Sequence, residues 1–405
     1  MAEPTTTTTG NGTILPSYDE AGSTVAAIAQ AGTISADEIA LYDRQIRLWG
    51  VHAQEKIRNA NILLISIRAL ANEVAKNLVL AGIASITLAD HEVVTENDLG
   101  AQFLVSDADI GKNRAEAAAP QVRKLNPRVK VNVITRDLRP EQDPNFYTPY
   151  DVIIATDLDF LGLINFDSVA TLANRPYYAA ASHGFYGYIF ANLISHDFVV
   201  EREKSNRPTL LAAETVTRSV LGTATKKENG KAIEMVTKRE TYCPMLAAKD
   251  SPLSRDVQSN KRKLRKVHPL LTCIRALWEY QYKSLGIFPT HSHADLEAFT
   301  QMATNKHKDL FLPPETLKAD FMRSFLQNLG SELAPVTAFL GGQLAQDVIN
   351  VLGKREQPIQ NMMLFDGEDS SGPIYTLNPL NFPEEVLCAI PANPTVPMTA
   401  TVTVL

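Results

Sequence analysis

The chain has 405 residues, and 39 lysines and arginines stand against 45 aspartates and glutamates, which gives a formal net charge of −6. This length allows two or three domains' worth of core, and the acidic balance argues against general electrostatic binding to nucleic acid or anionic membranes. The scattered cysteines Cys243, Cys273 and Cys388 exclude a disulfide framework and a four-cysteine zinc site. Without a membrane-length apolar run or a secretory leader, the chain is expected to be soluble and intracellular.

The N-terminal segment changes character near residue 35. Residues 1–34 are rich in threonine, glycine and alanine, so we expect a disordered tail there. Residues 35–38 have the pattern of a capping box, and the apolar residues that follow to Gly50 recur at helical spacing. This pattern predicts an amphipathic helix that carries Arg44 and Arg47 on its polar side.

Strands and helices then alternate in a β-α-β-α-β order. The continuous apolar run 61–67 is typical of a parallel strand buried on both faces. This order predicts the α/β class, with a Rossmann-like, doubly wound and mostly parallel sheet. Pro120 is expected to kink or shorten the second of the helices. We predict strands at 61–67, 84–90, 129–135 and 151–156, with helices at 71–81 and 111–124.

After the parallel strands, the chain is expected to form an inserted region outside the sheet and then to add further elements to the sheet. Strands joined by glycine turns are predicted from residue 175 to 200, and a strongly apolar helix is predicted over 334–353, followed by two short closing strands. The predicted organisation is a tail (1–34), a first sheet part (35–200), a mostly helical insertion (201–330), a second sheet part (331–385) and a tail (386–405).

The turn after the first predicted strand lacks the glycines of a nucleotide site. In nucleotide-binding folds, G-x-G-x-x-G lets backbone N–H groups approach the phosphates at the start of the next helix. Here Ser66, Arg68, Ala69 and Ala71 replace the glycines, and a side chain at the point of closest approach would fill the volume of the pyrophosphate. We therefore predict a degenerate site, and phosphate binding through the Arg68 guanidinium is the alternative.

Several stretches, taken in order, resemble the activating enzymes of ubiquitin-like proteins, which have a ThiF/MoeB-like fold. Within that superfamily the resemblance is to the small subunits of SUMO-activating enzymes, which lack the catalytic cysteine. The stretches are LYDRQIRLWG (41–50), NEVAKNLVLAGIASITLADHEVV (72–94), DLGAQFLV (98–105), IGKNRAEAA (110–118), GFYGYIFANL (184–193) and APVTAFLGGQLAQDVI (334–349).

The resemblance implies a heterodimer of two related Rossmann-like subunits. The large subunit binds Mg·ATP, holds a structural zinc and supplies the thioester cysteine, whereas the small subunit has lost its own nucleotide site. On this basis the chain would bind no cofactor and no metal, and it would be inactive alone. Its implied partners are the cysteine-bearing large subunit, SUMO and, indirectly, the SUMO-conjugating enzyme, and its implied location is nuclear.

Further positions of the family pattern are altered. Active subunits carry an asparagine and an arginine before a Gln-Phe pair, where this chain has Asp98 and Ala101, and Arg114 stands in place of a family lysine. Asp90 remains at the end of the second strand, where the family has a ribose-binding acid. An acid at a strand end also serves as a helix or turn cap, and we favour that role for Asp90.

Arg44 is the candidate catalytic residue. In the resemblance, the arginine of YDRQ reaches across the dimer to the terminal phosphates of the partner's ATP. A permanently charged planar donor offsets the charge that builds on the leaving pyrophosphate, as arginine fingers do. The alternative is a solvated helix arginine. Arg47 is expected to be structural and to pair with Asp43, one turn earlier.

The remaining candidates have structural explanations. Cys243, in TYCPM, superficially resembles a thioester site, but Lys238 and Arg239 are the sole nearby cations in sequence, so we assign it a structural role. Cys273 is expected in the core. The basic run 260–266 fits either a nuclear import signal or a solvated helix face.

Three other functions compete with the leading one. The regulatory subunit of the neddylation-activating enzyme is a near relative, but it carries a much longer helical insertion. An NAD(P)-dependent oxidoreductase fits the topology alone, and the missing glycines count against it. A scaffold that organises the partner without chemistry would not need Arg44.

Overall fold

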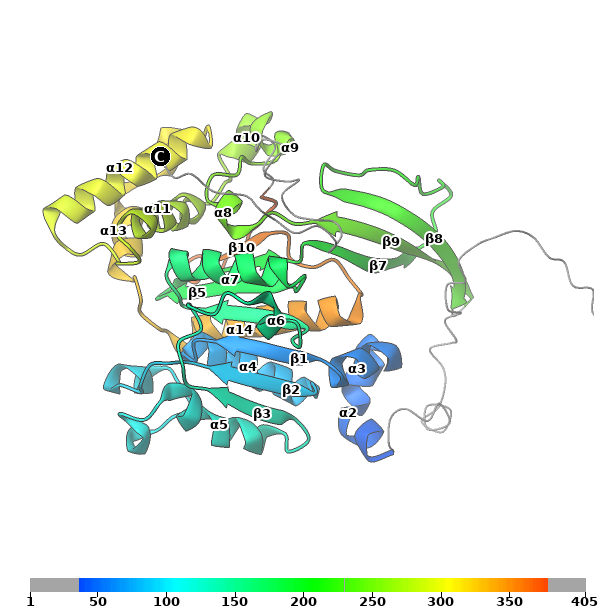
Figure 1. Cartoon of the computed structure of the whole chain (residues 1–405). Coiled ribbons are helices and arrows are strands. Elements are labelled where there is room, and N and C mark those ends of the chain that lie inside the picture. Colours follow the sequence, from blue (N-terminus) through cyan, green and yellow to red (C-terminus); the bar gives the residue numbers. More distant parts are fainter. Residues whose placement is uncertain (1–35, 229, 378–405) are drawn as a thin grey trace, which may run out of the picture.

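The structure, a computed structural model, describes residues 36–228 and 230–377 (Figure 1). Its centre is an eight-stranded sheet with the order β11-β10-β6-β5-β4-β1-β2-β3. The five strands from β5 to β3 run parallel, whereas β6, β10 and β11 each pair antiparallel with their neighbours. The strands are β1 (Asn61–Ile65), β2 (Ser85–Ala89), β3 (Lys130–Ile134), β4 (Val152–Thr156), β5 (Tyr177–His183), β6 (Tyr186–Asn192), β10 (Met362–Asp366) and β11 (Ile374–Tyr375).

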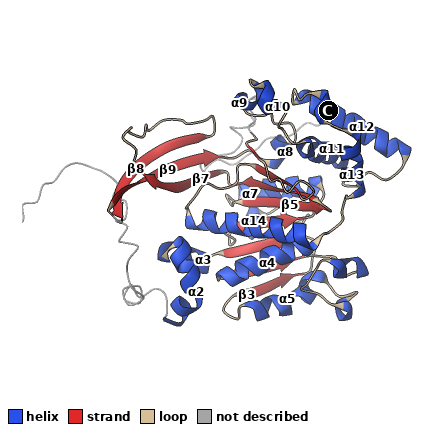
Figure 2. Ribbon diagram, turned by 180° about the vertical axis from the view of Figure 1, so that it is seen from behind, coloured by secondary structure: helices blue, strands red, loops and turns tan. Residues whose placement is uncertain are grey.

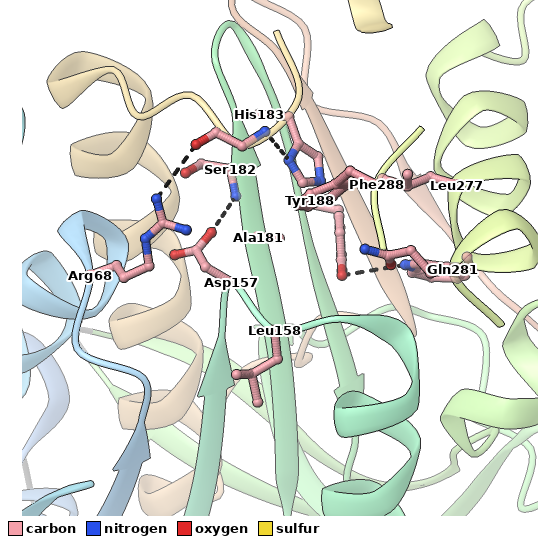
Figure 3. A pocket seen from close by; sticks show the side chains of 12 residues that line it. Arg68, Asp157, Leu158, Ala181, Ser182, His183, Tyr188, Leu277, Gln281 and Phe288 are labelled. Carbon is pink, nitrogen blue, oxygen red and sulfur yellow. Dashed lines mark hydrogen bonds between the residues drawn. The ribbon is translucent and has the colours of Figure 1, made fainter. Parts of the chain in front are cut away.

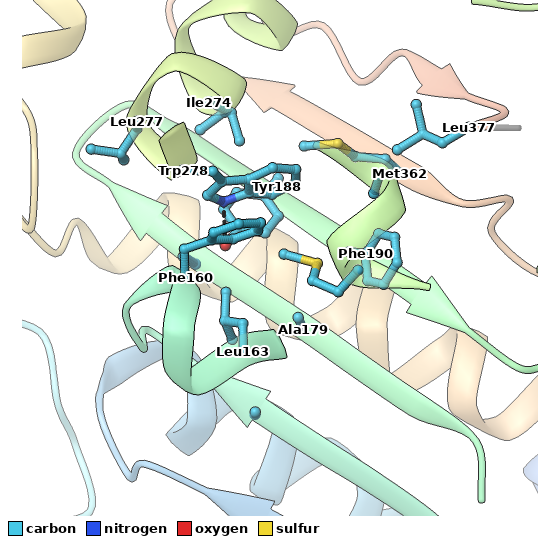
Figure 4. Close-up of a cluster of buried hydrophobic side chains, with 14 of the residues drawn as sticks. Phe160, Leu163, Ala179, Tyr188, Phe190, Ile274, Leu277, Trp278, Met362 and Leu377 are labelled. Carbon is cyan, nitrogen blue, oxygen red and sulfur yellow. Dashed lines mark hydrogen bonds between the residues drawn. The ribbon is translucent and has the colours of Figure 1, made fainter. Parts of the chain in front are cut away.

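Helices cover both faces of this sheet, which confirms the predicted α/β architecture. One core contains α4 (Ala69–Ala81), α5 (Arg114–Leu125) and α14 (Ala334–Gly353). The other contains α7 (Phe160–Leu172) and α11 (Pro269–Lys283). In the second core Phe160 stacks on Trp278 with ring centroids 5.2 Å apart, and the Trp278 indole donates to Tyr188 Oη at 3.4 Å (Figure 4). Burial of such large rings is the main source of core stability.

A small second sheet lies at the start of the insertion. Its first strand begins in the stretch 175–200, where strands were predicted, whereas its other two strands lie in the insertion and were not predicted. β7 (Ser195–Glu203), β9 (Lys231–Thr241) and β8 (Arg218–Glu228) form a separate antiparallel sheet in that order (Figure 2). The expectation of a mostly helical insertion therefore holds only after residue 244. Its helices are α8 (Met245–Ala248), α9 (Arg255–Gln258), α10 (Lys261–Leu264), α11, α12 (His293–Asp309) and α13 (Ala319–Gln327).

The N-terminal helices pack beside the sheet. α2 (Ala36–Trp49) has a non-helical residue at Tyr42 and is followed by α3 (Val51–Arg58). The Tyr42 hydroxyl accepts a hydrogen bond from Asn126 Nδ2 at 2.8 Å, which ties α2 to the sheet domain. α5 continues past Pro120 to Leu125, and a short α6 spans Pro144–Tyr147. The proposed cap Ser35, the predicted tails 1–34 and 386–405, and residues 378–385 of the predicted second sheet part lie outside the described residues.

No helix in the described part of the chain is both long enough and apolar enough to cross a lipid bilayer.

Candidate functional site

Arg44 lies on the outer side of α2. Tyr42 and Ile46 bury the opposite side of the helix, at 5% and 7% exposure, whereas Arg44 is exposed. Among the described residues, no hydrogen bond or ion pair engages its guanidinium. Leu41 and Leu48, three residues before and four after it, are also exposed, at 55% and 74%. Arg44 therefore lies between two exposed apolar side chains, and within residues 36–228 and 230–377 its guanidinium has no hydrogen-bond or ion-pair partner.

Arg47 behaves as the sequence predicted. Its Nε lies 2.9 Å from Asp43 Oδ2, four residues earlier on the same helix. Both side chains are solvent-accessible, so this pair contributes little to stability. The two arginines thus differ in their contacts. The Arg47 guanidinium forms an ion pair on its own helix, whereas the Arg44 guanidinium forms none with a described residue.

The phosphate end of the predicted nucleotide site contains a carboxylate of the chain itself. Ser66 has a φ of 68°, a left-handed conformation that favours glycine. Beyond it, Arg68 is the N-cap of α4, and the Ala69 N–H donates to Glu332 Oε1 at 3.0 Å. Arg68 Nε lies 3.3 Å from the same oxygen. A helix N-terminus of this kind is the usual place for a phosphate, and here Glu332 occupies it.

The ribose end is filled by a second ion pair. Asp90 Oδ2 accepts from the Ile67 N–H at 2.7 Å and from Arg114 Nη1 at 2.9 Å, while Oδ1 accepts from the Glu92 N–H at 2.9 Å. Burial by itself lowers the pKa of Arg114, but the charge and hydrogen bond of Asp90, with the charges of Asp98 and Glu92, outweigh burial and raise it. Asp90 therefore caps backbone groups and balances Arg114.

Both carboxylate oxygens of Asp98 also accept hydrogen bonds from neighbouring residues. It closes a capping box, because its Oδ2 accepts from the Thr95 N–H at 2.7 Å, and its Oδ1 accepts from Gln102 Nε2 at 2.6 Å. Ala101 ends this short 3₁₀ turn and offers no polar group. The positions where active family members bind nucleotide thus hold residues with local structural partners.

A small pocket with both polar and apolar lining residues lies next to this region, at the carboxyl ends of β4 and β5 (Figure 3). Arg68, Asp157, Ser182 and His183 line it, and its volume of about 10 Å³ is room for roughly one water molecule. Burial raises the pKa of Asp157, and burial, together with the charge of Arg68, lowers the pKa of His183 to about 4. Sequence reasoning missed Asp157, His183 and Glu332. Asp157 could have been found, because it directly follows a buried strand and ligands of open α/β sheets bind at the carboxyl ends of the strands.

Both described cysteines are buried thiols. Cys243 and Cys273 are 3% and 0% exposed, and burial raises the pKa of each thiol well above its usual value. The cations near Cys243 in sequence pair elsewhere, Lys238 with Glu214 and Arg239 with Asp197. The charge of the buried Arg275 lowers the pKa of the Cys243 thiol, but burial outweighs it. This burial supports a structural role for both cysteines. Cys388 lies outside the described residues.

One group of potential metal ligands has an explanation without a metal. His268, Asp366 and Asp369 lie close together. His268 Nδ1 accepts from the Leu270 N–H at 3.2 Å as the cap of α11, so the ring proton is on Nε2, which lies 3.3 Å from Asp366 Oδ2. A capped helix start joined to a buried carboxylate accounts for this geometry.

Comparison with known proteins places the fold in a family. The model of the ThiF family matches residues 42–384. The chain belongs to the ThiF family. It is 35% identical over 347 residues to the DNA damage tolerance protein RHC31 of Saccharomyces cerevisiae, covering 84% of this chain and 97% of that protein.

Two further relatives are both named SUMO-activating enzyme subunit 1. The chain is 35% identical over 348 residues to SUMO-activating enzyme subunit 1 of Xenopus tropicalis, with 85% of this chain and 96% of the relative covered. It is 34% identical over 354 residues to the human protein of that name, with coverages of 86% and 97%. The resemblance to the small subunits of SUMO-activating enzymes is thereby confirmed, and the ThiF family assignment favours it over an oxidoreductase.

Proposed function

We propose that the chain is the small subunit of a heterodimeric SUMO-activating enzyme and is inactive alone. The cysteine-bearing large subunit would bind Mg·ATP, adenylate the C-terminus of SUMO and form the thioester. The names of the relatives support this function, since the matches span nearly their whole length. The observation that carries the proposal is the contrast between a nucleotide site filled by Glu332 and Arg114 and an exposed, unengaged Arg44.

Arg44 would act in the partner's site. Adenylation joins the carboxylate of SUMO to the α-phosphate of ATP and releases pyrophosphate, so two anions meet and charge grows on the leaving group. A guanidinium delivered from a second subunit stabilises that charge with fixed, planar donors. Leu41 and Leu48 beside Arg44 would be covered when the partner docks, which would place the guanidinium at a desolvated interface.

The chain's own site would bind no nucleotide. At the ribose end Arg114 satisfies Asp90, and at the phosphate end Glu332 satisfies the start of α4. The partners are then the large subunit, SUMO and, through the enzyme, the SUMO-conjugating enzyme. A nuclear location is part of the proposal, and the basic run 260–266, which includes α10, is a candidate import signal.

Reconstitution tests this function. The full chain is co-expressed with a cysteine-bearing subunit, and thioester formation on that subunit is measured with SUMO and, in parallel, with the neddylation modifier. We expect a stable complex that charges SUMO. Charging of the neddylation modifier instead would favour the alternative, and failure of the two chains to associate would overturn the proposal.

A further inference from the structure

The part of α2 that carries Arg44 has few apolar contacts with the rest of the protein. The helix is kinked at Tyr42, where φ is −105° and ψ is 17°, so Arg44 lies in the first turn of a separate segment, residues 43–49. Over residues 40–49 only Tyr42 and Ile46 are buried, and they form a small cluster apart from the two main cores. The polar contacts of this segment therefore contribute strongly to its orientation.

At its start the segment is held by Asn126. Tyr42 Oη accepts a hydrogen bond from Asn126 Nδ2 at 2.8 Å, and the same nitrogen donates to Val79 O at 3.0 Å. Val79 O is among the last four carbonyls of α4, which have no partner within the helix. The Tyr42 ring also lies against Gly82, where an added Cβ would be 2.5 Å from Cζ. Asn126 is 6% exposed, so this contact is shielded from water.

A second buried amide holds the end of the segment in the same way. Trp49 Nε1 donates to Gln54 Oε1 at 2.8 Å, and Gln54 Nε2 donates to Ala81 O at 3.0 Å. Gln54 is 1% exposed, and Ala81 is the last residue of α4. Both ends of the segment are therefore connected through an amide side chain to the final turn of α4, a helix of the main core.

These contacts determine where the Arg44 guanidinium points. Arg44 lies two residues from each of the buried side chains Tyr42 and Ile46, so about half a helical turn separates it from both. It therefore leaves α2 on the side away from α4. A donor that stabilises a transition state must be placed closely, because a misplacement of about 1 Å can cost roughly 100-fold in rate.

We propose that Tyr42 is a positioning residue that acts on the reaction through Arg44. The hydrogen bond from Asn126 holds residues 43–49 at a fixed rotation against α4, and this rotation sets the direction in which Arg44 extends to the partner's triphosphate. The inference rests on the proposed function, because it assigns a second residue to the same site. A guanidinium oriented in advance stabilises the leaving group without a further cost of reorganisation.

Tyr42→Phe tests this role, because it keeps the ring against Gly82 and removes only the acceptor. In the heterodimer we expect normal assembly and a maximal rate of SUMO-dependent ATP–pyrophosphate exchange that is lowered by about 5- to 100-fold, the upper limit being the cost of a 1 Å misplacement. Asn126→Ala removes the donor instead and should lower the same rate. Tyr147→Phe is the matched control, since the buried Tyr147 donates from Oη to Glu141 O at 3.1 Å, far from α2 in sequence, and its loss should leave exchange unchanged.

A double variant separates positioning from a general loss of stability. If Tyr42 acts through Arg44, Tyr42→Phe should slow exchange no further in an Arg44→Ala background, because the group that it orients is gone. Equal slowing in both backgrounds, or an unchanged rate in Tyr42→Phe or Asn126→Ala, would overturn the inference. If Arg44→Ala is slow and Tyr42→Phe is not, the inference alone is wrong. If Arg44→Ala exchanges at the normal rate, the proposed role of Arg44 fails and the inference fails with it.

Discussion

Replacement of Arg44 by alanine separates a chemical role from a scaffolding role. In the structure the Arg44 side chain is exposed and forms no hydrogen bond or ion pair with another described residue, so the fold should be unaffected. Loss of one charged donor at a developing phosphate charge typically costs about 2.7 to 4 kcal/mol, or roughly 100- to 1,000-fold in rate. We therefore expect Arg44→Ala to form the heterodimer normally and to slow adenylation by that factor.

The assay should isolate the step that involves the triphosphate. SUMO-dependent ATP–pyrophosphate exchange should show the full defect, whereas transfer of SUMO from a preformed thioester to the conjugating enzyme should not change. Arg44→Lys should restore activity only in part, because an ammonium keeps the charge but lacks the planar fork.

Arg47→Ala is the matched control on the same helix. It removes an accessible pair with Asp43 that is worth about 0.3 to 0.5 kcal/mol, so its effect on exchange should be small. If Arg44→Ala exchanges pyrophosphate at the normal rate in a verified heterodimer, the role in trans is wrong and the scaffold interpretation is correct.

Three further predictions concern binding and stability. Isothermal titration of the isolated chain with Mg·ATP should give no heat beyond dilution, and micromolar affinity would refute the closed site. Gly82→Ala should destabilise by about 2 to 4 kcal/mol in thermal unfolding, because the new Cβ would lie 2.5 Å from Tyr42 Cζ at a φ of +83°; an unchanged midpoint would show that α2 is not held through Tyr42. Burial, together with the charge of Arg68, lowers the pKa of His183 from 6.5 to about 4, so the unfolded chain takes up this proton first, and His183 contributes a loss of stability as the pH falls from about 6.5 to 4. His183→Asn should flatten that slope, and an unchanged slope would contradict this cause.

The sheet could be predicted from the sequence wherever the chain is buried on both faces. β1 and β4 consist mostly of apolar residues, β2 is buried along its whole length, and α14 spans the predicted residues 334–353. The hairpin β8–β9 was missed because charged residues share its buried positions with Val220 and Val236. Glu234 and Glu240 are buried there and form ion pairs with Arg202 and Arg218, respectively. The alternation of polar and apolar residues that indicates a strand is therefore incomplete in this sequence.

The candidate site was predictable where its signals are local. The absence of glycines at 66–71 and the Arg47–Asp43 spacing can be read directly from adjacent residues. Glu332 gave no such signal, since its contact with Ala69 arises only when the linker before α14 folds over the carboxyl ends of the central strands. The pairing of Arg114 with Asp90 likewise arises only when the start of α5 comes to lie beside the end of β2.

The most direct test of the proposed division of labour is ATP–pyrophosphate exchange with purified SUMO, measured for each subunit alone and for the two combined. We expect exchange from the heterodimer and negligible exchange from either chain by itself, because one supplies the ATP site and the other supplies Arg44. Exchange by the cysteine-bearing subunit alone at the rate of the heterodimer would contradict a catalytic contribution of this chain.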